Sequence, residues 1–210
     1  NEHIMNEERK GGTMEKVLLN MKAISKTFGS VQALKEVSLD LYAGEVLALM
    51  GENGAGKSTL MNILSGSLQP TKGEIYLKGE KVTVSGPIAA KKLGISKIHQ
   101  ELQIVPELSV AENIFLGRWM KKKGGSVDFK TMAAEARKYL EMLDVHVDPA
   151  TKLKDLRIGE QQLVEIAKAI SLNSEIIIMD EPTSAISEKE AEKLFTIIRK
   201  LRSEGKGIIY

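Results

Sequence analysis

Eight consecutive residues have types and spacing suited to holding phosphate: Gly51-Glu52-Asn53-Gly54-Ala55-Gly56-Lys57-Ser58. They match the P-loop pattern G-x-x-x-x-G-K-[ST] at every fixed position. The glycines allow backbone angles that turn successive N–H groups inward, and a helix beginning here adds its dipole and unpaired N–H groups. Lys57 would reach the β- and γ-phosphates, and the Ser58 hydroxyl would bind Mg²⁺. The alternative is a glycine-rich turn without a ligand.

A second candidate element is an apolar run that ends in two acids, Ile176-Ile177-Ile178-Met179-Asp180-Glu181. In a P-loop site, Asp180 would hold Mg²⁺ through water, and Glu181 would polarise the attacking water as a general base. Taken alone, such a run is typical of a strand with a solvated end. A P-loop needs a second strand that carries carboxylates, so the two motifs together favour the catalytic interpretation.

These motifs require buried strands and adjoining helices to position them. The continuous apolar run Val46–Met50 predicts a strand buried on both faces before the loop, and Leu60, Ile63 and Leu64 predict one apolar face of a helix after it. Hydrophobic patterning predicts further strands at residues 17–21, 37–41, 73–77, 81–84 and 176–179, a helix at 188–204, and a strand beginning at Gly207.

The hydrophobic pattern of the chain changes at about Glu101, after which no run has the pattern of a strand until residue 176. Met132–Leu143 has the spacing of an amphipathic helix, so we predict a helical insertion at about residues 101–160. Residues 1–13 are polar and indicate a tail or an expression remnant, which leaves residues 14–210 as one nucleotide-binding domain. Because the last predicted strand stops at Tyr210, we expect this domain to be truncated.

Composition excludes several classes of protein. Of the 210 residues, 42% are hydrophobic and 28% are charged, which is ordinary soluble usage. The formal net charge of +2 gives no electrostatic reason to expect a nucleic-acid partner. The absence of cysteine excludes disulfides, thiolate metal sites and thiol catalysis, and the three histidines lie far apart. No window approaches the roughly 18–20 consecutive apolar residues of a membrane span.

From about Met14 to Tyr210 the chain resembles the ATP-binding-cassette (ABC) ATPases. Three stretches are more specifically similar to simple-sugar importers of the ribose, galactose and xylose type, in which two cassettes are commonly fused: Ile98–Glu101, Leu108–Ile114 and Ile158–Ala167. The resemblance implies an α/β P-loop NTPase with a RecA-like core, an antiparallel β subdomain and an inserted α-helical subdomain. This chain would be the first of the two cassettes.

The resemblance also implies residue roles. Gln100 would contact Mg²⁺ or the attacking water, although a glutamine here is otherwise a solvated loop residue. Phe28 would stack on adenine, unless it is a core phenylalanine. Arg157, Ile158, Gly159 and Glu160 stand where the family's signature caps the γ-phosphate of the opposing cassette. The implied nucleotide-binding residues are Phe28, Gly51, Glu52, Asn53, Gly54, Ala55, Gly56, Lys57, Ser58 and Thr59.

Three departures from the family pattern bear on turnover. The signature serine and glutamine are Arg157 and Glu160, and the aspartate of the family's D-loop is Ser187. The family's histidine beyond the strand that starts at Gly207 is absent. We therefore expect this fragment to bind ATP and Mg²⁺ with little turnover.

The implied function is that of an ATP-binding subunit of a sugar importer, peripheral on the cytoplasmic face of the plasma (inner) membrane. ATP binding and hydrolysis would drive dimerisation with a second cassette and import through separate transmembrane permease subunits. A sugar-binding protein would be an indirect partner, and no nucleic acid is expected. One alternative is a soluble ABC ATPase outside transport, against which the weak net charge argues. The other is a degenerate regulatory nucleotide-binding module, motivated by Arg157 and Ser187.

Overall fold

The computed structural model describes residues 16–52, 54–98, 103–180 and 188–210. The chain divides into two compact units. The first holds the described residues up to Lys97 together with Glu175–Asp180 and Leu201–Tyr210. The second holds Ile98, residues 103–174 and residues 188–200.

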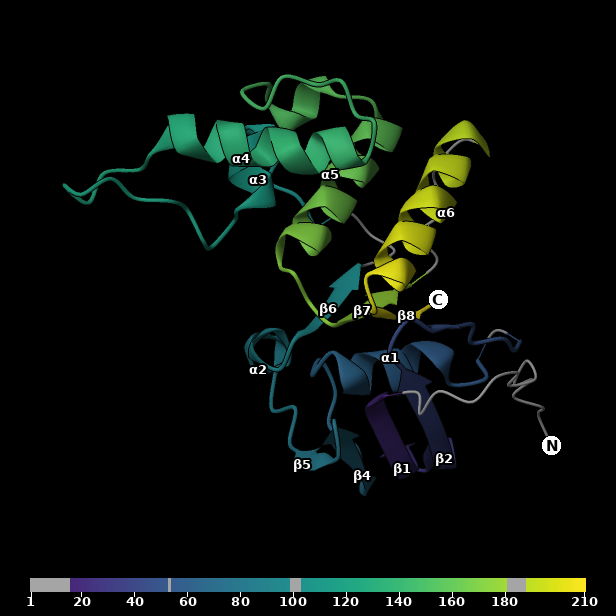
Figure 1. Ribbon diagram of the computed structural model, residues 1–210. Helices are drawn as coiled ribbons and strands as arrows, with labels where there is room; N and C mark the ends of the chain where they lie inside the picture. Colours follow the sequence, from purple (N-terminus) through teal and green to yellow (C-terminus); the bar gives the residue numbers. More distant parts are fainter. Residues whose placement is uncertain (1–15, 53, 99–102, 181–187) are drawn as a thin grey trace. The chain divides into compact units, whose positions relative to one another are not determined.

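The first unit contains two four-stranded sheets (Figure 1). One is antiparallel in all the strand pairs described and has the order β2-β1-β4-β5. The other has the order β3-β8-β7-β6, and β8 runs parallel to both β3 and β7. The bounds of the eight strands are β1 Val17–Phe28, β2 Val31–Tyr42, β3 Val46–Leu47, β4 Lys72–Leu77, β5 Glu80–Val82, β6 Ile95–Ile98, β7 Ile176–Met179 and β8 Gly207–Ile209.

Helix α1 (Lys57–Leu64) joins both sheets of the first unit into one hydrophobic core. Its buried residues Leu60, Met61, Ile63 and Leu64 recur on one face, and they belong to the same cluster as Leu41 of β2 and Ile178 of β7. Each fully buried side chain of this kind contributes roughly 1.5–3 kcal/mol. The core therefore fixes the start of α1 relative to the strands, which matters for the P-loop that precedes it. Helix α2 (Pro87–Lys92) completes the unit.

Helices make up the regular structure of the second unit. They are α3 (Val110–Ile114), α4 (Phe129–Met142), the 3₁₀ turn η1 (Leu153–Asp155) and α5 (Ile158–Ser171). Met132, Ala136 and Leu140 of α4 are buried at spacings of one helical turn. Asp128 accepts a hydrogen bond from the Thr131 N–H at 3.1 Å and so caps the start of this helix. Helix α6 (Glu188–Ser203) begins in the second unit and ends in the first.

Most sequence-predicted elements are present, with shifted bounds. Strand β7 occupies residues 176–179 as predicted, but β1 and β2 are longer than predicted because their pairing continues to Phe28 and Val31 at the turn. The strand predicted at Val46–Met50 is shorter, because β3 pairs only Val46 with Ile208 and Leu47 with Ile209. The prediction that it is buried on both faces is wrong, since only Leu47 of this run is buried. Sequence patterning missed α2, β6 and α3, each of which has six residues or fewer.

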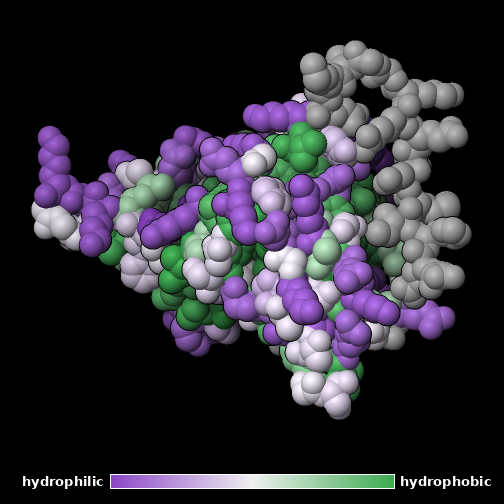
Figure 2. Space-filling model, turned by 90° about the horizontal axis from the view of Figure 1, so that it is seen from below, coloured by the Kyte–Doolittle hydropathy of each residue, from purple (hydrophilic) through white to green (hydrophobic). Residues whose placement is uncertain are grey.

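The surface carries both apolar and polar side chains. On the face drawn in Figure 2, hydrophobic patches are interspersed with hydrophilic side chains. Exposed large apolar residues include Val31, Met50 and Ile88, which come from different elements or loops. Among the residues that the structure describes, none of the helices is long and apolar enough to cross a bilayer.

Candidate functional site

The P-loop begins from a strand segment that β8 holds in place. The Ile208 N–H donates to the Glu45 carbonyl at 2.9 Å, and the Tyr210 N–H donates to the Leu47 carbonyl at 2.9 Å. The Leu49 N–H returns a hydrogen bond to the Tyr210 carbonyl at 2.8 Å. Parallel pairing therefore continues beyond the short strand β3, and the chain enters the loop at Gly51 from a fixed direction.

Gly56 is the turning point between the loop and α1. It is the residue before the helix and has φ = +92°, a left-handed conformation that costs free energy for any residue with a side chain. A Cβ atom at this position would lie 2.7 Å from Leu34 Cδ2 and 2.8 Å from the Ala33 carbonyl oxygen. Glycine has no side chain with which to cap α1, so the first-turn N–H groups gain no side-chain acceptor from this residue. This is the cradle that a phosphate group requires.

The Lys57 side chain folds back over the loop. Its ammonium group donates hydrogen bonds to the carbonyl oxygens of Gly51 and Glu52, the second at 2.9 Å. The loop therefore already holds the cation on the side of the helix N-terminus. Ser58, the next residue of α1, is exposed, so its hydroxyl is accessible for a metal ion.

Asp180 lies directly after β7 and forms an ion pair that the sequence did not reveal. Lys97 Nζ lies 2.9 Å from Asp180 Oδ2, and it donates a hydrogen bond to Asn62 Oδ1 of α1 at 2.8 Å. The Lys97 side chain is only 5% exposed and that of Asp180 is 17% exposed. Lys97 belongs to β6, which neighbours β7 in the sheet. A lysine between Ile95-Ser96 and Ile98, in a short run flanked by isoleucines, is the signal by which it could have been noticed.

These residues fit a nucleoside triphosphate with Mg²⁺. The cradle at Gly56, the Lys57 ammonium, the Ser58 hydroxyl and the Asp180 carboxylate supply the donors and oxygen ligands that such a group needs. Within the described part of the chain, no three His, Asp or Glu side chains come close enough to hold a metal ion by themselves. In nucleotide sites Mg²⁺ usually takes several of its ligands from the phosphates and water, with one or two side chains of the protein.

Three predicted site residues, Asn53, Gln100 and Glu181, lie outside the described residues. Phe28, predicted to stack on adenine, is the last residue of β1 and is 46% exposed, with Lys26 Nζ 5.1 Å from its ring centroid. It is therefore not a core phenylalanine, and its role towards adenine stays a prediction.

The predicted signature residues lie at the start of α5 in the second unit. Arg157 is the residue before the helix, and its N–H donates to Glu160 Oε2 at 2.9 Å. The Glu160 carboxylate thus bends back to cap its own helix, in the manner of one half of a capping box. It places a negative charge at a helix N-terminus, which stabilises the helix but opposes the approach of a phosphate.

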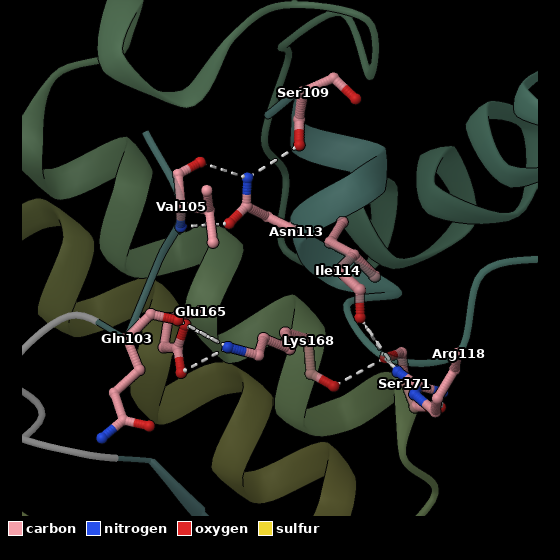
Figure 3. Close-up of polar contacts among 9 residues, drawn as sticks. All are labelled: Gln103, Val105, Ser109, Asn113, Ile114, Arg118, Glu165, Lys168 and Ser171. Atoms are coloured by element: carbon pink, nitrogen blue, oxygen red, sulfur yellow. Dashed lines mark hydrogen bonds and ion pairs between the residues drawn. The ribbon is translucent and has the colours of Figure 1, made fainter. Parts of the chain in front are cut away.

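A polar cluster in the second unit holds residues 103–105 (Figure 3). Asn113 of α3 is buried; its Oδ1 accepts from the Val105 N–H at 2.8 Å, and its Nδ2 donates to the Val105 carbonyl at 3.0 Å. Lys168 of α5 donates to the Gln103 carbonyl at 2.7 Å and lies 3.2 Å from Glu165 Oε2. These contacts fix the segment to α3 and α5. Sequence reasoning assigned no role to Asn113 or Lys168.

Arg118 joins the ends of α3 and α5. Its guanidinium donates to the Ile114 carbonyl at 3.0 Å, to Ser171 Oγ at 2.6 Å and to the Ser171 carbonyl at 3.2 Å (Figure 3). Partial burial lowers the pKa of Arg118 from its ordinary value, and the group stays a cation in any folding buffer. The arrangement is structural: it ties two helix ends through one side chain.

Comparison with known proteins places this site in a family. Residues 34–184 match the ABC transporter family. The chain is 53% identical over 193 residues to a ribose import ATP-binding protein of Caldanaerobacter subterraneus subsp. tengcongensis, covering 92% of this chain and 39% of that protein. It is 50% identical over 192 residues to an arabinose import ATP-binding protein of Escherichia coli O6:H1, covering 91% of this chain and 38% of that protein. The chain thus spans about two fifths of the length of these curated relatives.

Solved structures agree with the fold. The ADP conformation of an ATP-binding cassette of an ABC transporter superposes with a TM-score of 0.80 at 30% identity, covering 92% of this chain and 80% of that one. A dimeric post-hydrolysis cassette bound to ADP and Pi superposes with a TM-score of 0.76 at 29% identity, covering 91% and 86%. Together with the P-loop, these matches show that the chain belongs to the ABC transporter family and has the P-loop NTPase fold of its ATP-binding cassettes.

Proposed function

We propose that this chain binds ATP with Mg²⁺ and serves as an ATP-binding subunit of a sugar importer. The observation that carries the proposal is the cradle at Gly56, which has left-handed backbone and no room for a Cβ, immediately followed by a lysine held over the loop. Relatives named for ribose and arabinose import, at 53% and 50% identity, support the transport assignment.

We assign a role to each site residue. Lys57 and the first-turn N–H groups of α1 hold the phosphates, and Ser58 and Asp180 supply oxygen atoms toward Mg²⁺. When bound, Mg²⁺ neutralises negative charge on the phosphoryl groups and orients them. We assign the general base to Glu181, which would take a proton from the attacking water, and we assign Gln100 to orient that water. Phe28 is exposed at the end of β1 and offers a stacking surface for adenine.

The partners follow from the same assignment. A second cassette would supply the signature that completes this P-loop, while Arg157–Glu160 of this chain would complete the other site. Transmembrane permease subunits would dock on the second unit, where Asn113 and Lys168 hold residues 103–105. The chain would then lie on the cytoplasmic face of the membrane, with a sugar-binding protein as an indirect partner. The helical insertion at about residues 101–160 remains our proposed subdomain within the domain 14–210.

A second candidate function, a regulatory module with little turnover, is favoured by Glu160. Its carboxylate caps α5 through the Arg157 N–H and lies where the family presents a neutral glutamine to phosphate. A fixed negative charge there would weaken the closed, two-cassette state. In that case the P-loop of this chain would still bind ATP, while the site completed by its signature would hydrolyse slowly.

Nucleotide titration of this chain tests the proposal. Calorimetry with ATP and Mg²⁺ should give saturable binding, and Lys57→Ala should abolish it because the cation on the phosphates is lost. Lys78→Met is the matched control, because Lys78 pairs with Glu175 at the opposite end of β7 from Asp180. Wild-type affinity in Lys57→Ala, or no binding by the unaltered chain, would refute the assignment. Steady-state phosphate release would then separate an active subunit from the regulatory alternative.

A further inference from the structure

We propose that Lys97 is a positioning residue of the nucleotide site, one that neutralises Asp180 and so lets the site accept ATP before Mg²⁺ arrives. This inference rests on the proposed function of the P-loop. It starts from the contact between Lys97 Nζ and Asp180 Oδ2 at 2.9 Å. Asp180 is the carboxylate that would face the metal.

Burial makes this ion pair more than a surface contact. Exposed ion pairs contribute little because water and salt screen them, but the Lys97 side chain is 5% exposed and cannot be solvated in that way. A buried ammonium group requires close partners, and Lys97 has two, the Asp180 carboxylate and Asn62 Oδ1 at 2.8 Å. Lys97 is thereby held in one place.

The two partners lie on elements that frame the site. Asn62 belongs to α1, whose first turn carries Lys57 and Ser58, and Asp180 follows β7 directly. Lys97 on β6 therefore links the helix after the P-loop to the carboxylate beside it. The link fixes the position of Asp180 relative to α1, whose Ser58 would approach the same Mg²⁺ ion.

The charge balance gives the functional consequence. Without a cation beside it, Asp180 would repel the negatively charged phosphates whenever Mg²⁺ is not there to separate them. With Lys97 in contact, the pair is close to neutral, and Lys57 can attract the phosphates without opposition. The ratio of the ATP dissociation constant in EDTA to that in Mg²⁺ is therefore kept low by Lys97.

The experiment measures this ratio for the whole chain by displacement of a fluorescent ATP analogue. Lys97→Met should raise the ratio about tenfold, since it leaves one uncompensated charge in a partly buried site. Lys97→Gln, which keeps a polar group near Asn62, should raise it similarly. Lys97→Arg retains the charge and should stay within about twofold of the unaltered chain. The control Lys78→Met removes the same charge from a half-exposed pair with Glu175 and should leave the ratio unchanged.

A cycle with Asp180→Asn separates positioning from a merely structural role. In the Asp180→Asn background, Lys97→Met should cause no further rise, because there is no carboxylate to neutralise. If both Lys97→Met and Lys97→Gln keep the ratio of the unaltered chain while that chain binds ATP, the inference about Lys97 is wrong and the proposed function stands. If Lys97→Met does not fold, Lys97→Gln alone decides. If the unaltered chain binds no ATP under either condition, both proposals are overturned.

Discussion

Replacing Gly56 by alanine tests whether the P-loop is built by close packing or by backbone angle alone. Gly56 and Gly54 have nearly the same backbone angle, with φ of +92° and +89°. Their surroundings differ, because a Cβ on Gly56 would meet Leu34 and the Ala33 carbonyl at 2.7 and 2.8 Å, whereas a Cβ on Gly54 would meet no atom within 4 Å. Gly54→Ala is therefore the matched control for strain without overlap.

The expected losses of stability follow from backbone strain and from steric overlap. A left-handed angle costs an alanine about 1–2 kcal/mol, and this cost is common to both variants. Overpacking adds a further ~1–3 kcal/mol to Gly56→Ala only, since the Ala33 carbonyl belongs to the backbone of β2 and cannot rotate aside as the Leu34 methyl can. For a chain of this size, each 1 kcal/mol corresponds to about 2–4 °C in Tm.

The assay is thermal unfolding by far-ultraviolet circular dichroism, with urea unfolding as a second measure. Gly54→Ala should lower Tm by several degrees, and Gly56→Ala should lower it by at least several more. ATP affinity should fall in both, because both belong to the phosphate-binding loop. If Gly56→Ala unfolded at the same temperature as Gly54→Ala, the packing of the loop against β2 would not be the reason for glycine at this position.

Three further predictions concern the second unit. Glu160→Gln retains an acceptor for the Arg157 N–H before α5, so the free energy of unfolding should fall by only about 0.3–1 kcal/mol. Phosphate release at high protein concentration should rise several-fold, and an unchanged rate would show that the carboxylate does not hinder turnover. Hydrogen bonds from the backbone N–H and the hydroxyl of Thr131 lower the pKa of Asp128. The stability that this gives is present above the unfolded pKa near about 3.9, and it is lost as pH falls through the lower folded pKa. Asp128→Asn still caps α4 but does not titrate, so its Tm should fall less than that of the unaltered chain between about pH 6 and about pH 3. Identical losses of Tm would contradict this. Arg118→Met should lower the free energy of unfolding by about 1–2 kcal/mol, because Ser171 and the Ile114 carbonyl lose their donor. ATP affinity should not change. A loss of affinity in a folded variant would mean that Arg118 acts on the nucleotide site.

Local patterning predicted strand β7 and the buried face of helix α1. Strand β7 agrees with its predicted bounds because all four of its residues are apolar and buried. Helix α1 follows the loop as predicted, since Gly56 forms the turn before it and the leucine and isoleucine spacing defines its buried face. Short elements were missed because a run of six residues or fewer carries too few periods to identify, as in α2 and β6.

The candidate site was predictable where one segment carries the chemistry and unpredictable where two segments meet. Gly51–Ser58 holds its lysine over its own carbonyls, an interaction within one loop. Lys97 has no motif around it, and it becomes significant only because β6 and β7 are neighbours and Asn62 of α1 lies against them. The same holds for Asn113, whose buried amide binds the Val105 backbone.

The order of residues by itself determined the family, the P-loop, the acidic end of β7 and the departures at Arg157 and Glu160, because each is a property of consecutive residues whose types set their own chemistry and backbone angles. Only the tertiary structure decided which distant charges meet, as in the pairing of Lys97 with Asp180. The physical reason is that sheet order and helix packing bring together groups far apart in the chain, and the burial that gives such contacts their strength arises only when the core forms.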